Sequence, residues 1–340
     1  MTDRRVLLVA SATTLEHDPV PGHPEQPERQ RAVLRGAASL GLGHSLPTIE
    51  PRPATLDELA AVHAPGYLDA LRQLCARGGG RIDADTAAGP SSWTAATLAA
   101  GAGLEAVARL RAGGADAAFC AVRPPGHHAT PRRPMGFCLL NNVAVTAASL
   151  AGAGERVLIV DIDAHHGNGT QDAFWDDPRV AYVSIHQWPL YPGTGALGET
   201  GGDQARGLTV NVPVPPGTGA DPYRAAVDDI LVPLVQRFEP AWLLLSAGFD
   251  AHRDDPLTNL GLTSGDYGDL TSRLAGLVPP GRVVAFLEGG YDLDALERCT
   301  AATLAALAGH DHRPEPVTAG DRGRDVVAAA ARAHHAALLT

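Results

Sequence analysis

Short runs of aliphatic and β-branched residues alternate with longer segments of helical periodicity along most of the chain. The apolar runs predict β-strands at Val6–Ala10, Ala117–Val122, Val157–Val160, Val180–Ile185, Leu208–Val212, Trp242–Ser246 and Val283–Leu287. Between them, the periodicity predicts helices at Ala95–Leu110, Asn142–Leu150, Tyr223–Phe238, Tyr267–Leu274 and Asp294–Leu307. This alternation is typical of an α/β fold in which helices cover both faces of a mostly parallel central sheet.

The chain of 340 residues contains no internal repeat and no linker that would divide it into two units. We therefore expect one α/β domain that spans residues 1–312. Beyond it, Pro314 and Pro316 interrupt the pattern. The Ala-rich segment 313–340 is expected to form a peripheral helix or a tail.

The chain carries 27 basic and 38 acidic side chains, a formal net charge of −11, and all of its basic residues are arginine. This charge argues against direct contact with nucleic acid or anionic membranes and favours cationic substrates, although solubility alone explains it equally well. The four cysteines form no CxxC pair, which is typical of free thiols in a reducing compartment. We find neither a signal peptide nor an apolar run long enough to cross a membrane, so we expect a cytoplasmic protein. A homo-oligomer is compatible with the sequence.

Polar side chains cluster where several predicted strands end. These clusters are Asp161–Thr170, Ser184–His186, Ala247–His252 and Glu288–Tyr291. Because ligands of open parallel sheets bind outside the carboxyl ends of the strands, we expect the clusters to converge on one edge of the sheet.

Two of the clusters contain candidate metal ligands. Asp163 and His165 are two residues apart, so they point the same way at the end of a strand, and Asp250 can supply a third ligand. Two carboxylates and one imidazole with an open coordination position are typical of catalytic zinc, although this donor set also accepts iron or cobalt. Taken alone, Asp-x-His occurs often by chance.

Two further segments carry groups suited to acid–base chemistry. The sequence Arg-Pro-Pro-Gly before His127 and His128 stiffens a loop that would hold both imidazoles beside a metal-bound water. Gly289 and Gly290 allow the hydroxyl of Tyr291 to reach a developing oxyanion. Taken singly, the histidine segment is equally typical of a proline-rich surface loop, and a Gly-Gly-Tyr segment usually forms only a turn.

In chain order, the motifs are Arg-Pro-Pro-Gly-His-His, Gly-Phe-Cys-Leu-Leu-Asn-Asn, Asp-Ile-Asp-Ala-His-His-Gly-Asn-Gly-Thr, Ser-Ala-Gly-Phe-Asp and Leu-Glu-Gly-Gly-Tyr. Together they resemble the histone deacetylase and acetylpolyamine amidohydrolase family, closest to its class II branch and bacterial relatives. The segment His23–Arg29 resembles the class II entrance segment, and the whole resemblance runs from His17 to Leu307. It implies the three-layer fold of arginases and deacetylases, with a deacetylase catalytic domain in residues 1–312.

The resemblance also implies roles for individual residues. One zinc ion would bind Asp163, His165 and Asp250. His128 would take a proton from the attacking water and later pass one to the leaving amine, beside His127, which is held by Asp161. Tyr291 would polarise the amide carbonyl together with zinc. Asn168 would orient His128, as asparagine does in class II members where class I members carry aspartate.

Two further groups of residues follow from the resemblance. A structural potassium ion would bind at an inner site formed by Asp161, Asp163, His165, Ser184 and Ile185. The acyl chain would lie in a narrow tunnel, and the substrate-binding residues would be Gly136, Phe137, Tyr191, Leu257, Gly289 and Gly290. The aromatic residues among them would otherwise be assigned to the core.

The substrate expected from the resemblance is an acylated lysine in a peptide or protein. Polyamine-selective relatives place an acidic residue where this chain has Leu257. An acetylated polyamine stays an alternative, because Asp18, Asp83 and Asp85 could line the entrance. Two rival interpretations are a two-manganese ureohydrolase, which would need acidic ligands at His252 and Asn168, and a catalytically silent binding protein, which typically lacks a ligand or the tyrosine.

Overall fold

A computed structural model describes residues 4–339 of the chain. Its centre is an eight-stranded sheet with the order β2-β1-β5-β10-β9-β6-β7-β8, in which all neighbouring strands are parallel. The strands are β1 (Val6–Val9), β2 (Thr48–Ile49), β5 (Ala117–Cys120), β6 (Val157–Asp161), β7 (Val180–Gln187), β8 (Thr209–Val214), β9 (Trp242–Ala247) and β10 (Val283–Leu287). The short strands β3 (Gly80–Arg81) and β4 (Ala87–Ala88) form a separate antiparallel pair. The predicted α/β class is confirmed.

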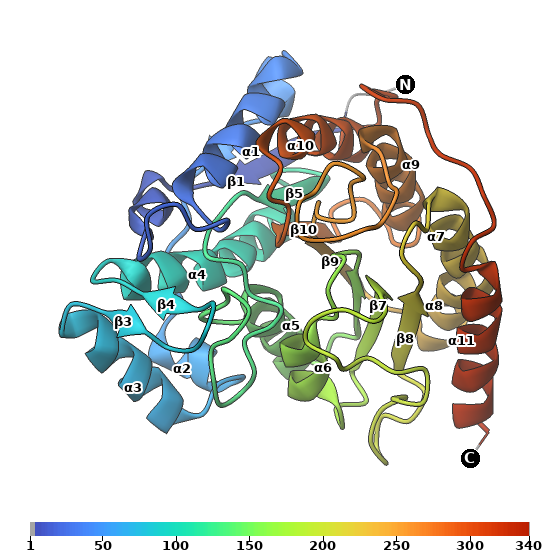
Figure 1. Cartoon of the computed structure of the whole chain (residues 1–340), viewed down its shortest axis with the longest axis horizontal. Coiled ribbons are helices and arrows are strands. Elements are labelled where there is room, and N and C mark those ends of the chain that lie inside the picture. The colour runs from blue at the N-terminus through green and yellow to red at the C-terminus, as the bar shows by residue number, and fades with distance from the viewer. Residues whose placement is uncertain (1–3, 340) are drawn as a thin grey trace.

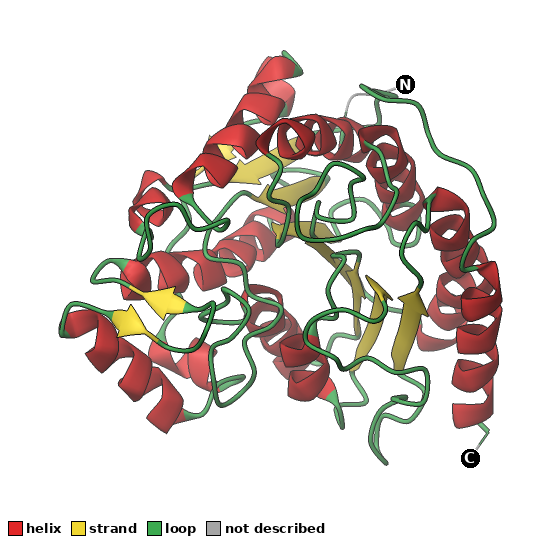
Figure 2. Cartoon of the chain, viewed as in Figure 1, coloured by secondary structure: helices red, strands yellow, loops and turns green. Residues whose placement is uncertain are grey.

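Helices cover both faces of this sheet (Figures 1 and 2). One face packs against α1 (Pro27–Ser39), α7 (Ala220–Ala226), α8 (Val232–Phe238), α9 (Ser264–Ala275), α10 (Leu293–Leu307) and α11 (Arg324–Ala337). The other packs against α2 (Leu56–Ala60), α3 (Pro65–Ala76), α4 (Ser92–Arg111), α5 (Asn142–Gly152) and α6 (Asn168–Phe174). Short 3₁₀ turns lie at Ala12–Glu16 and Gly43–Ser45, and a π-helical turn at Val227–Leu231 joins α7 to α8.

The hydrophobic core forms two layers because successive residues of a strand point to opposite faces. In β6, Leu158 and Val160 belong to the layer under α7–α10, whereas Val157 and Ile159 belong to the layer under α2–α5. Strands that are buried on both faces consist of nearly continuous apolar residues, which is the pattern that identified them in the sequence.

Each strand predicted from the sequence is present, and its ends agree with the prediction to within two residues. The predicted helix Tyr223–Phe238 is one helical stretch that begins earlier and contains the π-helical turn. The helices α1, α2, α3 and α6 were not predicted. The Ala-rich segment contains α11, which packs against β8 and α7, whereas the domain boundary at residue 312 stays a prediction.

Two further expectations concern the chain as a whole. Within residues 4–339, none of the helices has the length and the apolar composition that crossing a bilayer requires. All four cysteines are buried free thiols.

Five neighbouring strands position the polar clusters. The order β5-β10-β9-β6-β7 is continuous in the sheet. Since these strands are parallel, the segments that leave their carboxyl ends emerge at the same edge. The expected convergence of the clusters is therefore a direct consequence of the strand order.

Candidate active site

Three side chains at this edge form a candidate metal centre. Asp163 and His165 follow β6, and Asp250 follows β9, the strand next to it. Each offers one ligand atom, and the three atoms lie within 4.8 Å of one another. Nδ1 of His165 lies 2.8 Å from Oδ2 of Asp250 and 3.2 Å from Oδ1 of Asp163. The structure thus brings together the three residues that the sequence suggested as ligands.

Two glycines make room for the carboxylates. A Cβ atom on Gly248 would lie 2.1 Å from Oδ2 of Asp163, and one on Gly289 would lie 2.3 Å from Oδ2 of Asp250. The backbone N–H of Gly289 also donates to Oδ2 of Asp163 (2.7 Å). Any larger residue at these positions would displace the carboxylates, so the two motifs need glycine there. Gly289 therefore shapes the candidate metal centre.

The donor set fits a divalent cation. Asp163 and Asp250 are fully buried, and buried carboxylates need a compensating positive charge. Burial and repulsion by Asp163 raise the pKa of Asp250 to about 7. Although burial opposes it, hydrogen bonds with both carboxylates raise the pKa of His165 to about 10. These shifts show that the three groups favour a positive charge between them, which a metal ion would supply.

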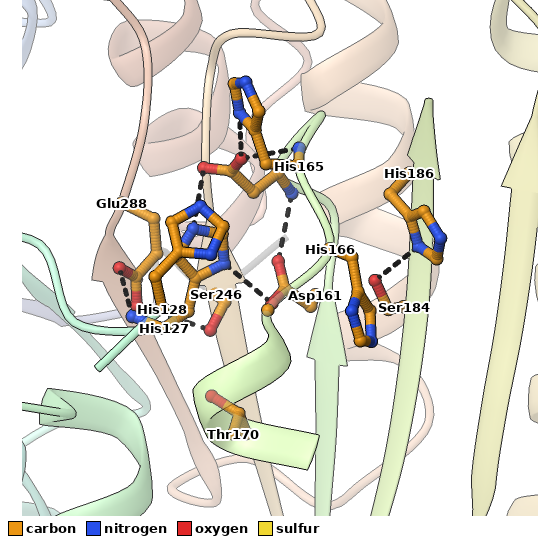
Figure 3. Close-up of polar contacts among 12 residues, drawn as sticks. His127, His128, Asp161, His165, His166, Thr170, Ser184, His186, Ser246 and Glu288 are labelled. Carbon is orange, nitrogen blue, oxygen red and sulfur yellow. Dashed lines mark hydrogen bonds and ion pairs between the residues drawn. The ribbon is translucent and has the colours of Figure 1, made fainter. Parts of the chain in front are cut away.

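The paired histidines lie beside this centre on the loop that follows β5 (Figure 3). Nδ1 of His127 donates to Oδ2 of Asp161 (3.0 Å), and Nδ1 of His128 donates to Oδ1 of Asn168 (2.9 Å). The orientation of the Asn168 amide follows from its other contacts, in which Nδ2 donates to the carbonyl of His128 (3.5 Å) and faces Sδ of Met135 (3.4 Å). His128 therefore carries its proton on Nδ1, which leaves the lone pair on Nε2.

The surroundings give the two imidazoles different charges. Burial alone would lower the pKa of His127, but the carboxylates of Asp163 and Asp161 raise it well above its ordinary value. Burial lowers the pKa of His128 well below its ordinary value, and His127 and His165 lower it further. At neutral pH, His127 holds a proton and His128 is ready to accept one.

Tyr291 lies on the segment that follows β10. Its ring packs edge-on against Phe137 at 5.7 Å between ring centroids, and the guanidinium of Arg29 lies 4.8 Å from its ring centroid. Gly290, which precedes it, has φ +117° and a Cβ atom there would lie 2.9 Å from Cβ of Phe249. Glycine at position 290 therefore allows the backbone conformation that precedes Tyr291.

The aromatic residues predicted for the tunnel border the same site. The ring of Tyr191 lies 5.1 Å from that of His128 and 6.4 Å from that of His165. Gly136 lies between these groups, because a Cβ atom on it would be 2.5 Å from Cδ2 of His128 and 3.0 Å from Cε1 of Tyr191. Tyr191 is 38% exposed, so the group of rings at the site reaches the surface at Tyr191.

Of the residues proposed for potassium, Asp161 ends β6, Ser184 and Ile185 lie on β7, and Asp163 and His165 follow β6. Asp161 and Ser184 are partners in the register of the two strands, and Ile185 follows on β7. The hydroxyl of Ser184 lies 2.9 Å from Nδ1 of His186, and Oδ1 of Asp161 accepts the backbone N–H of Asp163. These residues are adjacent, but potassium binding stays a prediction.

The acidic residues that could not be placed from the sequence include two on the loop between β3 and β4. Asp85 lines a surface pocket of about 220 Å³ together with Phe137 and His23. Burial raises the pKa of Tyr191, and the carboxylate of Asp85 raises it further. Asp83 is hydrogen-bonded to the backbone of Asp85 and Thr86 on the same loop. Leu257 is half-buried and donates its backbone N–H to Asp255.

A buried ion network behind the site was not identified from the sequence. Arg123 and Arg29 are fully buried and share the carboxylate of Glu25, at 2.6 Å and 3.1 Å respectively. Arg29 also donates through Nε to the carbonyl of Gly290 (2.7 Å). The only sequence signal for this network was the segment His23–Arg29 and the arginine that opens the Arg-Pro-Pro motif.

A second group of potential metal ligands consists of His252, Asp254 and Glu315. Arg253 lies 2.7 Å from the Glu315 carboxylate, and Arg298 lies within 4 Å of both carboxylates. Nε2 of His252 is hydrogen-bonded to Glu315 at 2.7 Å. Because these arginines already compensate the acidic charge, we interpret the group as an ion-pair network.

Comparisons with known proteins are consistent across sequence and structure. Residues 23–307 match the family model described as "Histone deacetylase domain". A "Probable deacetylase" of Archaeoglobus fulgidus is 40% identical over 304 residues, which cover 87% of this chain and 84% of the relative. A "Histone deacetylase-like amidohydrolase" of Pseudomonas aeruginosa is 36% identical over 294 residues, covering 85% and 77%. The crystal structure of the HDA15 HD domain superimposes with a TM-score of 0.90 at 35% identity, covering 97% of this chain and 94% of that one.

Proposed function

Because the chain belongs to the histone deacetylase family, we propose that it is a zinc-dependent amidohydrolase that removes acetyl, or another acyl group, from acylated lysine side chains of peptides or proteins. The observation that carries this proposal is the group formed by Asp163, His165 and Asp250, with the neutral imidazole of His128 beside it. Hydrolysis of an amide needs an electrophilic activator, a base for water, an acid for the amine and a donor to the oxyanion.

Asp163, His165 and Asp250 would hold zinc, which supplies a Lewis acid when it is bound. His128 would accept a proton from the attacking water on Nε2, because Nδ1 is already engaged by Asn168. The same imidazole would then donate that proton to the departing amine. His127 would remain charged throughout, since two carboxylates hold its proton.

Tyr291 would donate its hydroxyl hydrogen bond to the oxyanion that forms at the carbonyl. Burial raises the pKa of Tyr291 well above its ordinary value, although Arg29 opposes the shift, so the phenol keeps its proton. Phe137 and Tyr191 would guide the acyl-bearing chain to the site between aromatic rings. The potassium site at Asp161, Asp163, His165, Ser184 and Ile185 is part of the same proposal and would stabilise the loop that carries two of the zinc ligands.

An acetylated polyamine is the second candidate substrate. It is favoured by the placement of Asp85 beside Phe137 in one surface pocket, where a carboxylate could pair with a distant ammonium group. Leu257 favours acyl-lysine instead, because its side chain cannot form an ion pair.

The experiment that tests the proposal is a substrate panel compared by kcat/KM. The panel contains acetyl-lysine peptides, peptides with longer acyl groups, and acetylated polyamines, each with zinc-loaded protein. Acyl-lysine hydrolysis that exceeds polyamine hydrolysis supports the proposal. A clear preference for polyamines would transfer the function to the second candidate. Metal-loaded protein that hydrolyses none of these amides would refute deacylation.

A further inference from the structure

Glu288 is a buried carboxylate with no part in the chemistry described above. It directly follows β10 and is fully buried. Its side chain turns toward the neighbouring loop that carries the paired histidines, as Figure 3 shows. There, Oε2 accepts the backbone N–H groups of two successive residues, Gly126 (2.7 Å) and His127 (3.1 Å).

The loop that carries His127 and His128 is packed closely on both sides of these N–H groups. A Cβ atom on Gly126 would lie 2.4 Å from the backbone nitrogen of Asn142, so the loop is packed tightly against the start of α5. On its other side, the carbonyl of His127 accepts the backbone N–H of Thr170 (3.1 Å). A buried N–H that loses its acceptor is costly, so the loop would have to move if the carboxylate were removed.

The backbone of Glu288 is held independently of its side chain. Its carbonyl accepts a hydrogen bond from Nη2 of Arg29, and its N–H donates to the carbonyl of Ala247 (3.3 Å). Nε of the same arginine holds the carbonyl of Gly290 (2.7 Å), immediately before Tyr291. Glu288 therefore joins the segment that carries Tyr291 to the loop that carries His127 and His128.

We infer that Glu288 is a positioning residue that fixes the His127–His128 loop relative to Tyr291. The inference rests on the proposed function, in which His128 and Tyr291 act on the same amide. The base and the oxyanion donor come from separate segments that follow the paired strands β5 and β10, so contacts between the two segments contribute to setting their separation. The hydrogen bonds of Glu288 to Gly126 and His127 provide that contact.

The second oxygen of Glu288 makes a sharp test possible. Oε1 lies 3.4 Å from the hydroxyl of Ser246, which can both donate and accept. In Glu288→Gln, the amide oxygen can therefore accept both backbone N–H groups while the amide nitrogen donates to Ser246. This variant keeps both hydrogen bonds to the loop, removes the charge and reverses the direction of the contact with Ser246. Glu288→Met has a similar size but no acceptor, and Ser246→Ala removes only the contact at Oε1.

The measurements are kcat and KM on an acetyl-lysine peptide, metal content, and the midpoint of thermal unfolding, for wild type and all three variants. We expect Glu288→Gln and Ser246→Ala to stay within about 5-fold of the wild-type kcat, because both keep the two loop hydrogen bonds. Glu288→Met should lose about 10²-fold in kcat, with KM little changed and metal still bound, because displacing a catalytic group by about 1 Å has this effect.

A Glu288→Met variant with wild-type kcat would overturn the inference. So would equal losses in Glu288→Gln and Glu288→Met, since the charge and not the hydrogen bonds would then matter. If Glu288→Met does not fold, Glu288→Gln alone decides, because a folded and metal-loaded Gln variant with a loss near 10²-fold contradicts the inference. Wild-type protein that deacylates no substrate would instead refute the proposed function.

Discussion

Replacing Asn168 with aspartate puts a carboxylate where an amide now accepts the hydrogen bond of His128. The two atoms are 2.9 Å apart, and both side chains are buried. Two opposite charges about 4 Å apart attract by about 4 kcal/mol at an effective dielectric constant of about 20. Since one pKa unit corresponds to about 1.4 kcal/mol, this attraction corresponds to an increase of about 3 units in the pKa of His128. Desolvation of the new carboxylate offsets part of it, so we expect about 1–3 units.

The sign of the effect on activity follows from the role of His128 as a base. In the wild type, burial lowers the pKa of His128 well below 6.5, so the imidazole stays neutral and active at mildly acidic pH. In Asn168→Asp, the raised pKa protonates His128 at higher pH. The acidic limb of the pH profile of kcat/KM should therefore move to higher pH.

The assay is kcat/KM on an acetyl-lysine peptide as a function of pH with zinc-loaded protein. Gln73→Glu, on the exposed surface of α3, makes the same amide-to-acid change away from the site and should leave the profile unchanged. If Asn168→Asp turns over too slowly, an NMR titration of the His128 ring reports the same pKa. An acidic limb that stays in place or moves to lower pH would refute the assignment of His128 as the base beside Asn168.

Three other predictions follow from the site and its surroundings. Tyr291→Phe should lower kcat by about 10²-fold or more while zinc content is unchanged, and a variant with full activity would remove the proposed oxyanion donor. Added salt should lower kcat/KM for acetylated polyamines, because the chain has a net charge of −11 and surface charges are screened beyond about 10 Å at 0.1 M salt; a flat response would leave electrostatic steering unsupported. Although burial opposes it, the ion pair with Arg123 lowers the pKa of Glu25 to about 2. The stability from this pair should be complete above the unfolded pKa of about 4.3 and lost as the pH falls toward 2. Glu25→Gln should destabilise the fold by about 3–5 kcal/mol in urea unfolding at neutral pH, and an unchanged midpoint would contradict a structural role for the pair.

The sequence predicted those parts of the fold whose signal lies in runs of consecutive residues. The buried strand β10 consists of apolar residues alone, and β6 and β9 each contain one polar residue near the carboxyl end, so their positions are apparent without any structure. The helix α1 was not predicted because Arg29 and Gln30, both polar, are among its buried residues. Their burial is explained by hydrogen bonds to distant backbone carbonyls, which the sequence does not show.

The candidate site likewise contains residues that the sequence indicates and residues whose roles depend on contacts between distant segments. Asp163, His165, Asp250 and the paired histidines belong to motifs, and their residue types alone indicate metal and acid–base chemistry. Glu288 stands inside one of those motifs but was not assigned a role, because its partners are backbone N–H groups. The position of Asp85 depends on how the loop between β3 and β4 folds over Phe137, which only the three-dimensional structure reveals.

The metal content of the purified protein tests the central claim most directly. Two carboxylates and one imidazole that converge on a single point should hold about one zinc ion per chain. A chelator should remove this ion together with the activity, and added zinc should restore both. Two manganese ions per chain, or hydrolysis that persists in protein free of divalent metal, would contradict the account.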